Sequence, residues 1–104
     1  MLLYSVTVHI DADIESQWYD WMVQHHIPDV MKTGHFVSAE MSRIREPEDP
    51  RPGYRIEYRC RDAAAYRTYQ AECAPALQAD HTKRYAGRFK ASRQLLAPRE
   101  SWEA

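Results

Sequence analysis

The stretch "YRIEYRCR", Tyr54 to Arg61, alternates strictly between side chains that favour burial and charged side chains. Successive side chains of a β-strand point to opposite faces, so this pattern predicts a strand with one covered face and one polar face. The covered face consists of Tyr54, Ile56, Tyr58 and Cys60. Because a sheet with one apolar face needs a second layer packed on it, the rest of the chain must supply further strands and helices.

The regions on either side of this strand supply three more strands and two helices. Alternation of apolar and polar residues predicts strands at about 2–10, 35–45 and 88–96. Apolar residues at helical spacing follow the first strand at about 14–27 and the third strand at about 62–86. The order β-α-β-β-α-β is that of the ferredoxin-like α+β fold. We therefore expect a four-stranded antiparallel sheet with both helices on its apolar face.

Prolines are expected to break both helices. Pro28 has no N–H to donate to the Gln24 carbonyl, and it disfavours the helical conformation at Ile27. We expect the helix to stop there, and a separate short helical turn to follow and end at Gly34 in a left-handed conformation. Pro75 is expected to divide the second helix. The expected buried stripe of the first helix consists of Ile14, Trp18, Met22 and His25, with Trp21 beside it.

Polar residues mark the ends and turns of these elements. Asp11 or Asp13 is expected to accept hydrogen bonds from the free amides at the start of the first helix, and Asp62 at the start of the second. The segment "REPEDPRPG", residues 45–53, holds three prolines and a glycine, so we expect a charged, exposed turn between the second and third strands.

The composition indicates one domain and argues against several classes of protein. The 104 residues, 44% of them apolar, are enough for one core, and we place the domain at residues 1–96 and a tail at 97–104. Fourteen basic against fifteen acidic residues give a net charge of −1, so we expect no nucleic-acid partner. No apolar run approaches the roughly 20 residues that span a bilayer, and the strand-like N-terminus has no basic flank. We therefore expect no membrane partner and a cytoplasmic location.

Histidines cluster in the stretch "QHHIPDVMKTGHF", residues 24–36, which contains His25, His26 and His35. Adjacent residues on a helix point about 100° apart, so His25 and His26 cannot easily share one metal ion. The chain has no Cys-x-x-Cys pair, no Gly-rich phosphate loop and no Gly-x-Ser-x-Gly turn. We therefore expect no native metal and no cofactor.

Two motifs in this chain resemble those of a known family. Trp-x-x-Trp-Met-x-x-x-His-Ile-Pro, followed by Thr-Gly-x-Phe, occurs at residues 18–36, and Ala-Pro-x-Leu, followed by a histidine and an aromatic residue, occurs at 74–85. They resemble a family of short bacterial proteins of unknown function in the dimeric α/β-barrel superfamily of ferredoxin-like folds, and the likeness covers residues 1–96. The resemblance implies a homodimer whose two sheets face each other as a barrel. It also implies a ligand pocket between sheet and helices, but no particular activity.

His26 and His81 are the candidate catalytic residues. Each follows or precedes a predicted proline break, and both helices are expected to cover the same sheet face, so the two breaks could enclose one cavity. Trp18, Trp21 and Tyr58 are expected to form its walls and bind the substrate, since small-molecule pockets are mostly apolar with a few polar groups. A neutral imidazole donates at one nitrogen and accepts at the other, which suits acid–base chemistry or ligand orientation.

Three interpretations of these residues stay open at this point. The first is a small-molecule enzyme that needs no cofactor and uses a histidine to move a proton. The second is a non-catalytic dimeric module that binds a small molecule or regulates another protein. In the third, both histidines only hydrogen-bond the carbonyls that the proline breaks leave free, and the aromatic residues belong to the core. The sequence does not decide whether the protein is an enzyme.

Overall fold

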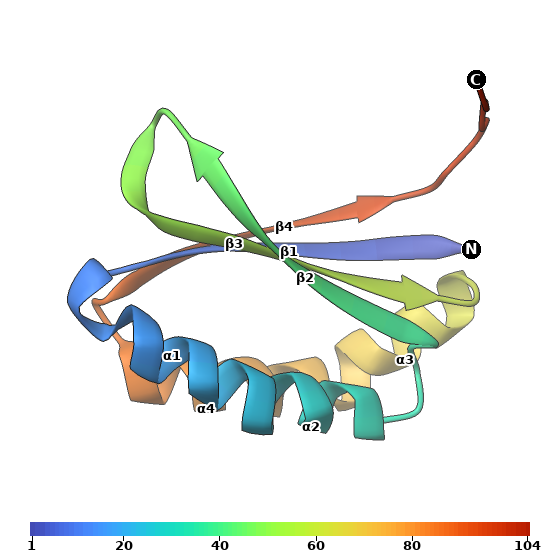
Figure 1. Ribbon diagram of the computed structural model, residues 1–104. Coiled ribbons are helices and arrows are strands. Elements are labelled where there is room, and N and C mark those ends of the chain that lie inside the picture. Colours follow the sequence, from blue (N-terminus) through green and yellow to red (C-terminus); the bar gives the residue numbers. More distant parts are fainter.

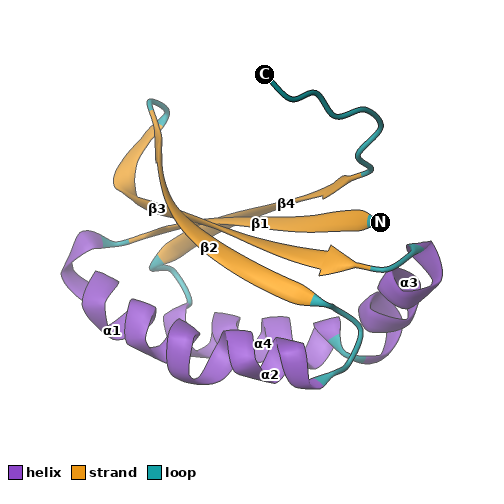
Figure 2. Cartoon of the chain, turned by 45° about the vertical axis from the view of Figure 1, so that its right-hand side comes forward, coloured by secondary structure: helices purple, strands orange, loops and turns teal.

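A computed structural model describes all residues, Met1–Ala104, and shows a sheet with every helix on the same side of it (Figures 1 and 2). The sheet has the strand order β2-β3-β1-β4, and each neighbouring pair is antiparallel. Its strands are β1 (Leu2–Ile10), β2 (Ser38–Glu46), β3 (Asp49–Cys60) and β4 (Phe89–Leu96). The predicted ferredoxin-like βαββαβ fold is therefore confirmed.

The core forms between the helices and the apolar face of β1 and β3. Tyr4 pairs with Tyr58 and Val8 with Tyr54 in the antiparallel register, so the alternating apolar residues of both strands share one face. The helices cover this face, and the buried apolar residues form one continuous cluster. The cluster consists of Tyr4, Val8, Ile10, Trp18, Trp21, Met22, Val30, Phe36, Tyr54, Ile56, Tyr58, Cys60, Tyr69, Ala74 and Tyr85.

The first helical region continues through Pro28, so the predicted break is wrong. Ile27 keeps helical angles, φ −62 and ψ −45, and its N–H donates to the Met22 carbonyl, five residues earlier. That is the bond of a π turn, whose wider ring gives space to a proline that would clash in a regular α-helix. The region consists of η1 (Ala12–Ile14), α1 (Glu15–Trp21), the π turn η2 (Met22–His26) and α2 (Ile27–Lys32).

The π turn also changes which side chains face the core. Trp18 and Val30, twelve positions apart, would point about 120° away from each other on a regular α-helix. The extra residue in the π turn offsets most of that rotation, and both side chains are buried. His25, predicted on the buried stripe, is exposed, and His26 takes the inward position instead. The predicted stripe is therefore wrong beyond Met22, because it assumed 3.6 residues per turn throughout.

The second helical region is divided next to Pro75. Helix α3 (Ala63–Glu72) and helix α4 (Ala74–Tyr85) are separated by Cys73, and Pro75 lies in the first turn of α4. The Asp62 carboxylate accepts a hydrogen bond from the Ala65 N–H at 2.8 Å, so the predicted cap of α3 is confirmed.

Asp11 and Asp13, predicted to cap the first helix, bind arginines instead. The Arg88 guanidinium donates to Asp11 at 2.7 Å and to Asp13 at 2.6 Å, and Arg51 donates to Asp11 at 3.2 Å. These ion pairs join the end of β1 to the residue before β4 and to β3. Arg88, followed by Arg51, holds the pKa of Asp11 below its usual range.

The segment between α2 and β2 contains Gly34, whose φ is +80. The predicted left-handed conformation is therefore confirmed, and a residue other than glycine would be strained there. The strand predicted to start at His35 begins only at Ser38, because the chain first places Phe36 in the core.

The segment 45–53 is mostly strand and not the long turn that was predicted. Only Pro47 and Glu48 form the turn of the β2–β3 hairpin. The pairing of β3 with β1 ends at Gly53, so the prolines before it lie where no bond to β1 is lost. The hairpin rises from the sheet on the side away from the helices (Figure 1).

The hairpin helps to bury part of the sheet face that the helices leave uncovered. Ser5 and His9 of β1 belong to this uncovered face, yet they are only 3% and 5% exposed. Gly53 lies opposite His9, where a Cβ would come within 2.8 Å of the imidazole Nε2. That nitrogen lies 3.3 Å from a Glu46 carboxylate oxygen but is not aligned for a hydrogen bond.

Residues 97–104 form no helix or strand and are exposed, which leaves the predicted division into domain and tail a prediction. None of the helices is both long enough and apolar enough to cross a membrane.

Candidate functional site

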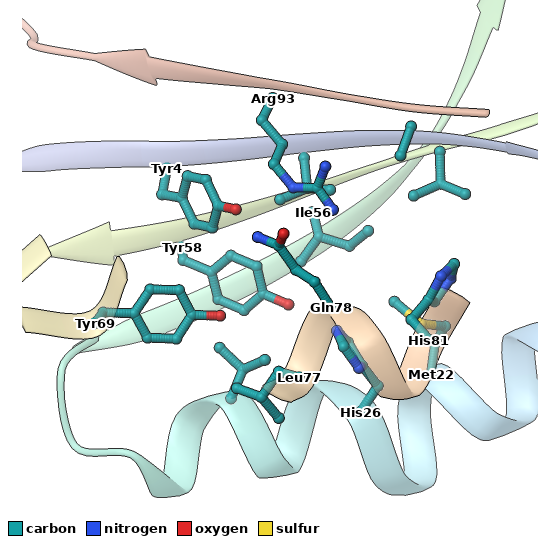
Figure 3. A pocket seen from close by; sticks show the side chains of 14 residues that line it. Tyr4, Met22, His26, Ile56, Tyr58, Tyr69, Leu77, Gln78, His81 and Arg93 are labelled. Carbon is teal, nitrogen blue, oxygen red and sulfur yellow. The ribbon is translucent and has the colours of Figure 1, made fainter. Parts of the chain in front are cut away.

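A cavity of about 40 Å³ lies between the helices and the covered face of the sheet (Figure 3). Such a volume holds roughly three water molecules. Ten of its 14 lining residues are aliphatic, methionine or tyrosine side chains from β1, β3, β4 and the helices. The other four lining residues are His26, Gln78, His81 and Arg93. An apolar wall with a few polar groups is typical of a small-molecule site.

The structure brings His26 and His81 together in this cavity. His26 comes from the last position of the π turn η2 and His81 from α4, and their ring centroids lie 5.8 Å apart at an angle of 65°. The π turn is what directs His26 inward, and π turns occur frequently at functional sites. His25, one residue earlier, is exposed and does not line the cavity.

A buried hydrogen bond determines the tautomer of His81. The Trp18 indole Nε1–H donates to His81 Nε2 at 2.9 Å, and both side chains are buried. Because Nε2 accepts this bond, the single proton of the neutral imidazole lies on Nδ1. Burial, with smaller effects from the charges of His26 and Arg93, lowers the pKa of His81 to about 4. At neutral pH His81 is therefore a hydrogen-bond donor whose other nitrogen is already occupied.

His26 differs from His81 in its hydrogen bonding. It forms no hydrogen bond within the chain, and its ring packs against Trp21 with centroids 5.3 Å apart. Burial lowers the pKa of His26, and the negative charges of Asp80 and Asp29 oppose this shift. A neutral imidazole with no bound partner can accept a proton at one nitrogen and donate at the other. Of the two histidines, only His26 is thus ready to take a proton from a ligand.

The three aromatic residues expected as walls occupy different places. Tyr58 lines the cavity, but Trp18 and Trp21 do not. Trp18 lies behind His81 and is fully buried, and Trp21 packs against the outer side of both histidines, 5.9 Å from the His81 ring. The two tryptophans therefore contact the imidazoles without lining the cavity, and their predicted role in binding a substrate stays a prediction.

Four polar residues that line the cavity were not among the site residues predicted from the sequence. Tyr4 and Tyr69 join Tyr58 in directing their hydroxyl groups toward the cavity, and these hydroxyls have no hydrogen-bond partner within the chain (Figure 3). Burial raises the pKa of Tyr58 and of Tyr69, so both stay protonated. Gln78 and Arg93 complete the polar set. Arg93 had a detectable signal, because it is the charged residue on the otherwise apolar face of the last strand.

Another hollow in the molecule lacks such convergent groups. An apolar groove of about 380 Å³ runs between α2 and β2, and Glu40 is its charged residue. It is larger than the histidine cavity but holds no group suited to proton transfer. No set of three His, Cys, Asp or Glu side chains lies close enough together to hold a metal ion.

The fold and the cavity define a ferredoxin-like α+β domain with a small, mostly apolar site between sheet and helices. The chain belongs to the family described as Domain of unknown function (DUF4286), whose model matches residues 1–98. The resemblance to a family of unknown function with this fold is thereby confirmed. No curated protein matches the chain.

Solved structures with the same fold cover almost the whole chain. HapK from Hahella chejuensis has a TM-score of 0.70 and 12% identity, over 100% of this chain and 98% of that one. SnoaB, a cofactor-independent oxygenase from Streptomyces nogalater, has a TM-score of 0.61 and 14% identity, over 96% and 94%. A dimeric ferredoxin-like protein from an uncultured marine organism has a TM-score of 0.64 and 13% identity, over 95% and 96%. At these identities the likeness shows a shared fold.

Proposed function

We propose that this protein binds a small organic molecule in the histidine cavity and exchanges a proton with it through His26. The observation that carries the proposal is the unequal state of two neighbouring imidazoles. His81 is held by Trp18 at 2.9 Å, whereas His26, with its ring centroid 5.8 Å from that of His81, has no partner. The imidazole of His26 lines the cavity and is free to bond a ligand.

The two histidines would act in different ways on a bound molecule. His26 accepts a proton from an acidic C–H or O–H of the ligand and becomes an imidazolium, and it returns the proton in a later step. The adjacent Nδ1–H of His81 can donate to an oxygen of the ligand, but with Nε2 engaged His81 does not accept a proton. The Tyr58 hydroxyl, which stays protonated, supplies a further donor.

Two further points support a reaction that needs no metal or cofactor. The lining residues offer donors and a base but no carboxylate or thiolate. SnoaB, which shares the fold, is a cofactor-independent oxygenase, so the fold can support chemistry of that kind. The alternative is a non-catalytic module that binds its ligand in the same cavity. Turnover of the ligand separates the two functions.

Ligand binding should depend on His26. A thermal-shift screen of small organic molecules is expected to give compounds that raise the melting temperature of the natural chain, and His26→Gln is expected to lose most of that shift. His25→Gln is the matched control, because it changes the neighbouring histidine on the exposed side of the same turn. Compounds that stabilise both variants equally would place the binding elsewhere, and the proposal would then be wrong.

We also propose that the chain forms a homodimer through the uncovered face of its sheet. Arg55 and Glu57 of that face lie opposite Thr7 and Ser5 of β1, and neither forms an ion pair within the chain. Polar side chains of this kind suit an interface between two sheets that contains bridging water molecules. One solved structure with this fold is described as a dimeric ferredoxin-like protein, which supports a dimer of this chain. Light scattering is expected to give twice the mass of one chain, and a monomer mass at micromolar concentration would contradict the proposal.

A further inference from the structure

We propose that the molecule bound in the histidine cavity is a small carboxylate and that Arg93 binds its negative charge. This inference rests on the proposed function, since it assigns the ligand class of the same site. Arg93 is not part of either sequence motif, and it lies on β4, away from the helices that carry the histidines. The site would therefore consist of a proton-exchanging end at His26 and a charged end at Arg93.

The position of Arg93 in the strand is unusual for a basic residue. It pairs with Val6 of β1, and its strand neighbours on the same face are Ala91 and Leu95. Side chains at alternate positions share a face, so Arg93 belongs to the face that the helices cover, whereas Lys90 points to the opposite face. An aliphatic side chain would suit a position that only packs against the helices. The guanidinium there is directed into the space between sheet and α4 (Figure 3).

The guanidinium of Arg93 has no acidic partner. It forms no hydrogen bond and no ion pair within the chain, whereas Arg51 and Arg88 near the end of β1 are both held by carboxylates. Arg93 is exposed at the mouth of the cavity. Burial is the main cause of the lowered pKa of His26 and of His81, and the charge of Arg93 adds to both shifts. Its donors are thus free to bind a planar, bidentate anion.

The rest of the cavity contributes no negative charge. None of its lining residues is Asp or Glu, the two histidines are neutral at pH 7, and the hydroxyls of Tyr58 and Tyr69 stay protonated. Asp29 and Asp80 act on His26 from outside and do not line the cavity. Among the lining residues, the charge at neutral pH is that of Arg93, at the mouth of the cavity. A carboxylate is the group that complements this charge.

The size of the cavity indicates how such a ligand would lie. About 40 Å³ accommodates only a few heavy atoms, so the carboxylate would stay at the mouth between Arg93 and Gln78. The remainder of a flat molecule would extend toward His26 and Tyr58 as the flexible Gln78 side chain moves aside. With the carboxylate at Arg93, the ligand atom bonded to the carboxylate lies toward His26. A proton on that atom can then be exchanged with the imidazole.

The test compares carboxylates with amides of the same shape. Acetate and acetamide, and glycolate and glycolamide, are titrated into isotope-labelled protein while the indole N–H signal of Trp18 and the ring signals of His26 are followed by NMR. Only the carboxylates are expected to shift these signals. Arg93→Gln should weaken carboxylate binding at least about tenfold, the usual loss when a charged hydrogen bond is removed.

Lys90→Gln is the matched control, because it removes the same charge from the same strand on the opposite sheet face. It is expected to leave carboxylate binding unchanged. If carboxylates and amides bind equally well, or if Arg93→Gln binds carboxylates as the natural chain does, the anion assignment is wrong and the small-molecule function stands. If neither class shifts the Trp18 or His26 signals, both the anion assignment and the proposed function are wrong.

Discussion

Lowering the pH from 7 to about 4.5 is expected to reduce the free energy of unfolding by about 2–3 kcal/mol through His81 alone. Burial lowers the pKa of His81 to about 4 in the folded chain, and the unfolded chain has the ordinary value near 6.5. Above pH 6.5 the His81 imidazole is neutral in the folded and in the unfolded chain, so the free energy of unfolding does not change through this group. Between 6.5 and 4 the unfolded state binds a proton that the folded state does not, so acidification favours unfolding. His26, whose pKa is also lowered, adds to the loss in the same range.

Chemical denaturation at several pH values measures this dependence. His81→Gln is expected to flatten the curve between pH 6.5 and 4.5, because glutamine does not titrate and its amide oxygen can still accept from the Trp18 indole. His25→Gln should leave the curve unchanged, since that side chain is exposed. The pH range from 6.5 to 4.5 lies above that in which Asp11 titrates, because Arg88 keeps the pKa of the Asp11 carboxyl low. An equally steep curve for His81→Gln would contradict the assignment.

Replacement of Trp18 by alanine is expected to cost about 3–5 kcal/mol of folding stability, the range for removal of a large buried aromatic residue. Trp18 is fully buried, its ring packs against Tyr54 at 5.1 Å, and it carries the hydrogen bond to His81. The substitution therefore leaves both a cavity and an unpaired imidazole nitrogen. Trp102→Ala is the control, since Trp102 is 85% exposed and should change stability by less than about 0.5 kcal/mol.

A second variant separates packing from hydrogen bonding. Trp18→Phe keeps much of the ring volume but removes the indole N–H, so we expect a smaller cost of about 1–3 kcal/mol from the unsatisfied His81 nitrogen. That nitrogen also becomes free to accept a proton, and the pKa of His81 should rise. NMR titration of the imidazole measures this change. A pKa of His81 that is unaltered in Trp18→Phe would show that the indole does not control its protonation.

The strands and their faces could be predicted from the sequence because alternation is a local signal. The pattern from Tyr54 to Cys60 assigns alternate side chains to the core without reference to other segments. In the observed register these side chains lie on the same face as the apolar residues of β1. Asp62 as a cap and Gly34 as a left-handed residue are equally local. The extent of the β2–β3 hairpin was harder to predict. Pro50 has no N–H, so it can belong to a strand only where no neighbouring strand requires a hydrogen bond from that position, and this depends on where β1 ends.

The candidate site could be predicted only in part, because side-chain orientation depends on contacts between distant segments. His26 and His81 were selected for their places beside Pro28 and Pro75, and the structure puts them in one cavity. The reason given for His26 was wrong, since the helix does not stop there. The bond between Trp18 and His81 joins residues 63 positions apart, and no local pattern announces it.

The π turn at residues 22–26 has a consequence for helical wheels and sequence alignments. A single wheel drawn over residues 15–32 at 100° per residue places every position after the turn on the wrong side, and it would present His25 as the inward histidine. Two wheels, one for α1 and one for α2, offset by a single residue, give the observed faces. A homologue that lacks the turn should align with this chain only after a one-residue gap within 22–26. The histidine to compare across that gap is His26.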